Sequence, residues 1–242
     1  MTALVGIKTR LRLARLAIVV PPEHSGPESA DFAAHGADLL IFTRGDRSVD
    51  DAAAAISVAR KRLFGLQTVV GTDDSEVAEA SLADVLYLRR PGWRPFGYKR
   101  PHEHALIGRS IDRAAEADRI DGDPFDFGFI GPAIDGGAVG HEVAELARLY
   151  PATALPAGPL WFAAGGITPD NVGQVIAAGA RRVVVSTAVF SGSDAFATTR
   201  AIADQLAEAW DGDPGARSYG EDAYDSDGPN FPTATLRPRP VD

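Results

Sequence analysis

The chain has 242 residues, of which 45% are hydrophobic and 24% charged, a composition typical of globular proteins and unlike that of disordered or fibrous ones. It contains no cysteine, which excludes disulfides, thiolate metal sites and a cysteine nucleophile. The formal net charge of −9 argues against a nucleic-acid partner, because binding to phosphate backbones needs a basic surface. The length allows one or two domains and also fits a single α/β barrel of about 250 residues.

The N-terminal region carries basic residues ahead of the apolar run Leu16–Val20, but it does not have the pattern of a secretory signal. The run ends at two prolines and is shorter than the roughly 7–15 apolar residues of a signal core. No other apolar run approaches the ~20 residues that span a bilayer. We therefore interpret Leu16–Val20 as a first buried strand and expect a cytoplasmic protein without a membrane partner.

Short apolar runs alternate with helical patterns along the chain. Each run has the length of a strand, and several are continuously apolar, as strands covered on both faces are. The eight runs are Leu16–Val20, Leu39–Thr43, Thr68–Gly71, Val85–Leu88, Ala105–Gly108, Phe127–Gly131, Leu160–Ala164 and Val183–Ser186. The helical patterns are Asp50–Leu63, Ser75–Leu82, Arg113–Ile120, Glu142–Tyr150, Asn171–Ala178 and Ala195–Trp210, with Thr168 and Pro169 typical of a helix start ahead of the fifth.

This alternation predicts a single (β/α)8 TIM barrel over residues 1–210. A doubly wound open sheet is the alternative, but the turn after the first strand lacks the glycine-rich fingerprint of a dinucleotide site. Residues 211–242 have seven acidic residues, three arginines, five prolines and four glycines, which predicts a flexible tail. Alternatively, Tyr219, Tyr224 and Phe231 dock on the barrel or on a partner subunit.

The loops after the seventh and eighth runs have the composition of a phosphate site. Gly165, Gly166 and Ile167 follow one run, and Ser186 and Thr187 follow the other. Glycine lets the backbone approach an anion closely, and helix N-terminal amides direct donors at it. In barrels, these two loops often hold a phosphate group. The two glycines could instead only turn the chain, but both loops indicate a phosphate site at the same place.

Several segments, in consistent order over about residues 14–206, resemble the thiamine phosphate synthase and thiazole tautomerase superfamily. The glycine segment alone is shared by many phosphate-binding barrels, whereas the ordered set is more specific. The matching segments are Ala37–Leu40, Ile107–Ser110, Asp126–Pro132, Trp161–Val172, Ala177–Ala180 and Val183–Ala188.

The resemblance implies a barrel that binds thiazole phosphate. In the synthases, this phosphate is joined to a pyrimidinylmethyl pyrophosphate with Mg2+ and loss of pyrophosphate, through a pyrimidine carbocation. Such chemistry needs cationic groups and a metal to stabilise the departing pyrophosphate. The resemblance also implies site roles for Ser110, after the fifth strand, and for Asp73, the one metal carboxylate that is retained.

The pyrophosphate half of the family site is largely missing. The family's Gln-x-Arg-x-Lys pattern after the second strand falls on Ile41, Thr43 and Gly45, and only the shifted Arg44 is basic. The metal aspartate after the fourth strand falls near Gly92, and the Thr-x-Thr-Lys loop after the sixth strand is replaced by 133–138. Asp73, with Asp74, is also typical of a turn and helix cap, which is the alternative to a possible Mg2+ site at Asp73.

Two further features are candidate site elements. Asp112 stands where the tautomerase branch has a proton-transferring histidine; it is a candidate general base or only a helix cap. Arg89, Arg90 and Arg94 belong to a loop, 89–100, that could close over an anionic ligand or be a solvated loop. His102 and His104 suggest a metal pair but have no nearby third ligand in the sequence.

Three functions follow from these observations. The first is an enzyme acting on thiazole phosphate or a related small phosphate, a diverged synthase whose catalytic candidates are Ser110, Asp112 and Arg44. The second is a catalytically silent phosphate-ligand binder or regulatory protein, which the lost cationic positions favour. The third is a tautomerase-like proton transfer that uses Asp112. A homo-oligomer is one candidate for the assembly.

Overall fold

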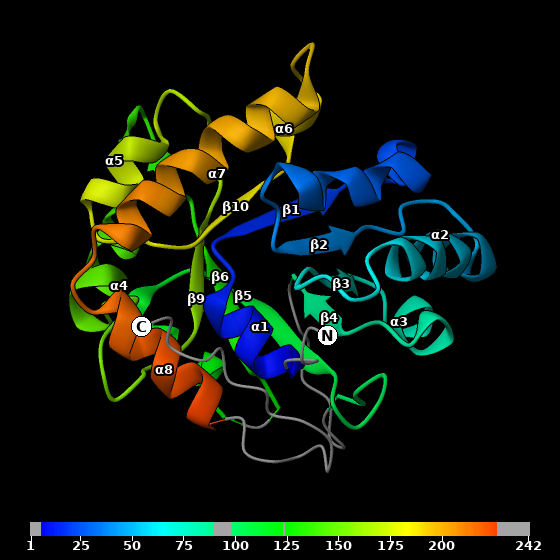
Figure 1. Ribbon diagram of the computed structural model, residues 1–242, viewed down its shortest axis with the longest axis horizontal. Coiled ribbons are helices and arrows are strands. Elements are labelled where there is room, and N and C mark those ends of the chain that lie inside the picture. The colour runs from blue at the N-terminus through cyan, green and yellow to red at the C-terminus, as the bar shows by residue number, and fades with distance from the viewer. Residues whose placement is uncertain (1–5, 90–97, 123, 227–242) are drawn as a thin grey trace, which may run out of the picture.

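The computed structural model describes residues 6–89, 98–122 and 124–226, and it contains a closed barrel of eight parallel strands (Figure 1). The strand order around the barrel is β1-β10-β9-β6-β5-β4-β3-β2, which confirms the predicted (β/α)8 fold. All eight predicted runs form barrel strands. Their bounds are β1 Leu16–Val20, β2 Leu39–Phe42, β3 Val69–Thr72, β4 Val85–Leu88, β5 Leu106–Ile111, β6 Phe127–Ile130, β9 Trp161–Ala164 and β10 Val183–Val185.

Helices cover the outside of the barrel, although not every connection contains an α-helix. The connections after β1 and β5 are 3-10 helices, and no helix follows β4 within the described part of that connection, 98–105. The helices are α1 Ile7–Leu13, η1 Pro22–His24, η2 Pro27–His35, α2 Val49–Arg62, α3 Ser75–Ser81, η3 Ala114–Ile120, α4 His141–Leu149, α5 Val172–Ala177, α6 Thr187–Phe190, α7 Ala195–Asp211 and α8 Ala216–Ser226. None of these helices is long and apolar enough to cross a membrane.

Alternation along the strands divides the core into two layers. One set of side chains packs outward against the helices, and it includes Ile18, Leu40 and Trp161. The other set fills the barrel interior, where aromatic rings of Phe127, Phe129 and Phe162 dominate. A packed interior leaves the ends of the barrel as the places where a ligand can bind.

Aspartates placed just before three strands fix the strand register. Asp38, Asp84 and Asp126 precede β2, β4 and β6, and each carboxylate accepts amide hydrogen bonds from the neighbouring strand. The donors are the backbone amides of Arg15, Leu16, Val70 and Ile107, at 2.7–3.1 Å. This register decides which side chains meet at the opposite, C-terminal rim.

The C-terminal segment differs from the expected loose tail. Residues 216–226 form α8, which lies beside α1 at the N-terminal end of the barrel (Figure 1). Tyr219 is 4% exposed, and Arg12 of α1 pairs with Asp222 of α8 at 2.7 Å. Over this stretch the packing matches the alternative expectation, in which Tyr219 docks on the barrel, because Tyr219 and Ala223 of α8 are buried. Phe231 and the rest of 227–242 lie outside the described residues, whereas Tyr224 is half exposed.

Candidate active site

The C-terminal rim of the barrel brings most of the predicted site residues to one end of the molecule. Loops after β2, β3, β9 and β10 carry Arg44, Asp73, the two glycines and the Ser186-Thr187 pair, and β5 carries Ser110. Parallel strands place all of these positions at the same rim. Arg90 and Arg94 lie outside the described residues, so their proposed role over the ligand stays a prediction.

The glycine loop after β9 has a backbone that only glycine adopts without strain. Gly165 has φ of 98° and Gly166 has φ of 73°, and both residues are exposed at the rim. The carbonyl of Gly166 accepts the side-chain amide of Asn171 at 2.8 Å, while the Asn171 side-chain oxygen accepts the amide of Thr168 at 2.8 Å. The Asn171 side chain therefore holds this loop in place through two hydrogen bonds. Asn171, and not Thr168, is the N-cap of α5.

The neighbouring loop after β10 completes this corner of the rim. Strands β9 and β10 pair directly, so the two loops are adjacent. The Ser186 hydroxyl donates to the Val19 carbonyl of β1 at 2.8 Å, which fixes the loop where Thr187 begins α6 with an exposed side chain. Ile167 is buried in the outer core layer, so only its backbone can serve a ligand.

A short hairpin in the loop after β6 lies against the glycine loop at this corner of the rim. Strands β7 Ile134–Asp135 and β8 Ala138–Val139 form it within the loop after β6. The amide of Ile134 donates to the Gly165 carbonyl at 3.1 Å, and a Cβ added to Gly166 would lie 2.9 Å from the Ile134 oxygen. The sequence analysis missed this hairpin, although two adjacent glycines, Gly136 and Gly137, are a sequence signal for a hairpin turn. Both glycines have positive φ in the structure.

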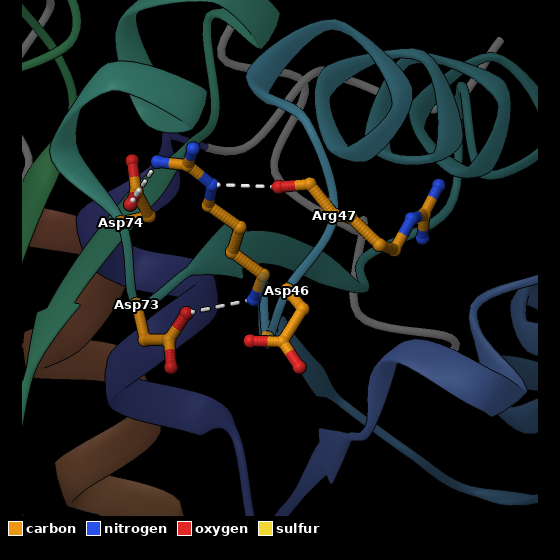
Figure 2. Close-up of a pocket in the computed structure, with 6 residues that line it drawn as sticks. Asp46, Arg47, Asp73 and Asp74 are labelled. Atoms are coloured by element: carbon orange, nitrogen blue, oxygen red, sulfur yellow. Dashed lines mark hydrogen bonds and ion pairs between the residues drawn. The ribbon is translucent and has the colours of Figure 1, made fainter.

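A cavity of about 320 Å³ opens between the loops after β2 and β3 (Figure 2). Its lining combines acidic and basic side chains at the mouth of the barrel. Figure 2 shows the Arg47 side chain directed away from Asp73 and Asp74. The lining residues are Arg44, Gly45, Asp46, Arg47, Asp73 and Asp74.

Arg44 is held by neighbouring groups in this cavity. Its guanidinium contacts Asp74 at 3.0 Å and Glu76 at 3.5 Å, and its Nε donates to the Arg47 carbonyl at 2.9 Å. These contacts direct the guanidinium to the start of α3. The one basic residue retained near the family's pyrophosphate pattern thus binds protein carboxylates in this structure.

The two adjacent aspartates have different environments. Burial raises the pKa of Asp73 above its ordinary value, and its Oδ1 accepts the Arg44 amide at 3.1 Å. Partial burial also acts on Asp74, but hydrogen bonds from the α3 amides and Arg44 lower its pKa overall. Asp74 is the N-cap of α3, accepting the amides of Glu76 and Val77, so only Asp73 is available for chemistry.

The role of Asp73 as a magnesium ligand stays a prediction. Mg2+ is commonly bound through one or two carboxylates together with substrate phosphate oxygens. The described residues hold no group of three or more acidic, histidine or cysteine side chains that could bind a metal by themselves. His102 and His104, with ring centroids 6.4 Å apart, are therefore without a third ligand in the described chain.

Ser110 has a partner that the sequence analysis did not identify. The Tyr87 hydroxyl, from neighbouring β4, lies 2.5 Å from the Ser110 side-chain oxygen. Burial raises the pKa of Tyr87, although the hydrogen bond with Ser110 and the charge of Arg89 act on it in the opposite direction. An inward-facing polar residue at the end of a barrel strand was the available signal, since strand alternation places Tyr87 in the interior.

Asp112 and Arg89 are exposed at the rim. The Asp112 amide donates to the Glu116 carboxylate at 3.2 Å, and the N-cap of the following helix η3 is Arg113. The interpretation of Asp112 as a helix cap is therefore wrong. Its role as a base stays a prediction.

Comparison with known proteins identifies the chain's family. Residues 34–189 match the family described as thiamine monophosphate synthase. The thiamine-phosphate synthase of Thermobifida fusca is 33% identical over 214 residues, covering 84% of this chain and 97% of that protein. The thiamine-phosphate synthase of Mycolicibacterium gilvum is 29% identical over 214 residues, covering 81% and 88%.

Among solved structures, a thiamine phosphate pyrophosphorylase from Pyrococcus furiosus superposes with a TM-score of 0.68 at 19% identity, covering 83% of this chain and 98% of that one. This likeness shows the shared barrel fold. The family match begins before β2 and ends in α6, so it spans seven of the eight barrel strands. Because the Thermobifida relative also aligns over nearly its whole length, the chain belongs to the thiamine monophosphate synthase family.

Proposed function

We propose that the protein binds thiazole phosphate at the rim of the barrel and couples it to a pyrimidinylmethyl pyrophosphate. The observation that carries this proposal is the pair of adjacent, exposed loops after β9 and β10, on the same rim as Asp73 and Ser110. Positive-φ glycines and the start of α6 offer backbone N–H donors there. Family membership supplies the substrate class.

In the proposed reaction, the bond from the pyrimidine methylene carbon to pyrophosphate breaks, pyrophosphate leaves, and the thiazole nitrogen then forms a bond to the carbocation at that carbon. The backbone of the two loops holds the thiazole phosphate, which positions the attacking nitrogen. Asp73 would hold a Mg2+ ion, which would neutralise charge on the departing pyrophosphate. Arg89, directly after β4, would add a positive charge, and Ser110 would orient the reacting ring.

Turnover is the direct test. Purified protein with both substrates and Mg2+ should form thiamine phosphate, and Asp73→Ala should lower kcat by at least about 100-fold, as loss of a major charge-stabilising group does. Asp50→Ala, an exposed acid in the first turn of α2, is the matched control and should keep full activity. Equal activity of the three proteins would overturn the role of Asp73.

A second candidate function is a catalytically silent phosphate-ligand binder. The contacts of Arg44 with Asp74 and Glu76 favour it, because they direct a needed cation away from the ligand. In that case no product forms, yet thiazole phosphate and inorganic phosphate should raise the Tm, since a ligand that binds only the folded state stabilises it.

Thr187→Glu tests the phosphate corner in either case. A carboxylate at this exposed first position of α6 should repel the phosphate and abolish the thermal shift while leaving the fold intact. Gly166→Asp is less suitable, because its Cβ would displace Ile134 of the hairpin. Ser218→Glu, exposed on α8 at the other end of the barrel, is the charge-matched control. Absence of both turnover and thermal shift in the wild type would refute both functions.

A further inference from the structure

The segment that follows β10 depends on its neighbours for its place at the rim. α6 has only four residues, about one turn, and the next four residues, 191–194, are exposed. A single turn of helix is not stable by itself in water, so tertiary packing must hold it. Two side chains of α6 supply that packing: Val189 is buried in the outer core layer, and Phe190 is half-buried against it.

Phe190 packs against the loop that follows β1. Its ring centroid lies 4.6 Å from that of His24 in η1, with the two planes 20° apart, which is a stacked arrangement. The Phe32 ring of η2 meets Phe190 edge-on, at 5.6 Å and 82°. Phe32 is 4% exposed and belongs to the core, whereas His24 is exposed. His24 therefore covers Phe190 from the solvent side.

The turn that carries His24 is itself held by the loop after β2 and the start of α2. The Arg47 guanidinium donates to the Ser25 hydroxyl and, at 2.6 Å, to the Asp51 carbonyl. The Ser25 hydroxyl donates in turn to the Pro22 carbonyl at 2.7 Å, which closes the turn around His24. The imidazole ring thus stands on a fixed support rather than on a free loop.

We propose that His24 is a positioning residue for the phosphate corner. Its ring holds Phe190, and through Phe190 it holds the segment 186–190 where the backbone can meet the phosphate of the ligand. This inference rests on the proposed function, because it names the side chain that keeps one of the two phosphate loops in place. The stack needs only a ring at position 24, and an aromatic pair of this kind contributes beyond the area it buries.

Binding of inorganic phosphate and of thiazole phosphate, measured by calorimetric titration, tests the proposal. His24→Ala should weaken both about 3- to 10-fold, as loss of one aromatic pair does. In turnover, KM for thiazole phosphate should rise by about the same factor with kcat unchanged, because the reacting groups are untouched. His24→Phe keeps a ring that can stack and should restore wild-type binding. His35→Ala is the matched control: His35 stacks on Phe196 at 4.8 Å and 20°, but it joins η2 to α7.

Hydrogen exchange in the ligand-free protein is the second readout. Amides 189–191 donate to the carbonyls of Ser186 and Thr187 at 2.8–3.2 Å. Their exchange should be about 3- to 10-fold faster in His24→Ala and unchanged in His35→Ala, because only the first variant frees this segment. Wild-type protein that bound neither probe would overturn the proposed function and this role together. Unchanged exchange in His24→Ala, or wild-type affinity in that variant, would overturn this inference alone.

Discussion

Tyr219 of α8 provides a sharp test of how the C-terminal segment is anchored. Its ring is buried against α1, lies 4.9 Å from the Arg12 guanidinium and 5.2 Å from that of Arg182, and meets the Trp210 ring edge-on at 6.0 Å. Arg182 itself is 2% exposed, and burial lowers its pKa. The two aromatic faces therefore cover a cation that is out of contact with water.

Tyr219→Ala should cost about 4 kcal/mol in the free energy of unfolding. Truncating a buried aromatic side chain costs about 3–5 kcal/mol. The lost contact with a desolvated cation accounts for up to about 2 kcal/mol of this cost. At about 2–4 °C per kcal/mol for a chain of this size, the Tm should fall by about 8–16 °C. Urea unfolding followed by circular dichroism measures the free energy, and a thermal scan measures the Tm.

Tyr224→Ala is the matched control, because Tyr224 belongs to the same helix and is 50% exposed. It should change the free energy of unfolding by less than about 0.5 kcal/mol. Both variants should keep the wild-type kcat at 20 °C, since α8 lies at the end of the barrel opposite the rim. A loss for Tyr219→Ala no larger than that for Tyr224→Ala would refute the docking of α8.

Three other variants probe the rim and the core. Asp73→Asn should raise the free energy of unfolding at pH 7, because burial raises the folded-state pKa of Asp73 and so disfavours its charged form. This gain should shrink as the pH falls through the folded-state pKa, and it should vanish below about 3.8, the ordinary value. Urea unfolding at a series of pH values measures it. Gly108→Ala should lower the free energy of unfolding by about 1–3 kcal/mol through overpacking against Phe127, while Gly173→Ala in α5, whose Cβ has room, should not destabilise. Arg44→Ala should change kcat/KM less than about threefold, because its guanidinium binds Asp74; a loss above about 30-fold in steady-state assays would show that it turns to the substrate.

The sequence was sufficient to predict the barrel because its signals are local. Each of the eight apolar runs is long enough for one strand and is bounded by turn residues, and alternation with helical patterns leaves few topologies. The glycine loop was predictable for the same reason, since Gly165 and Gly166 stand directly after a strand and their positive φ needs no distant partner.

The site chemistry depended on contacts between residues far apart in the chain. The Tyr87–Ser110 pair follows from the register of β4 on β5, and the direction of Arg44 follows from where α3 begins. Composition predicted a loose segment from residue 211, but it could not show that Tyr219 would find Arg12 and Arg182, which precede it by 207 and 37 positions. Local patterns thus determined the strands and the rim loops, whereas side-chain partners were decided by three-dimensional packing, because hydrogen bonds and cation–π contacts depend on distances that the sequence does not specify.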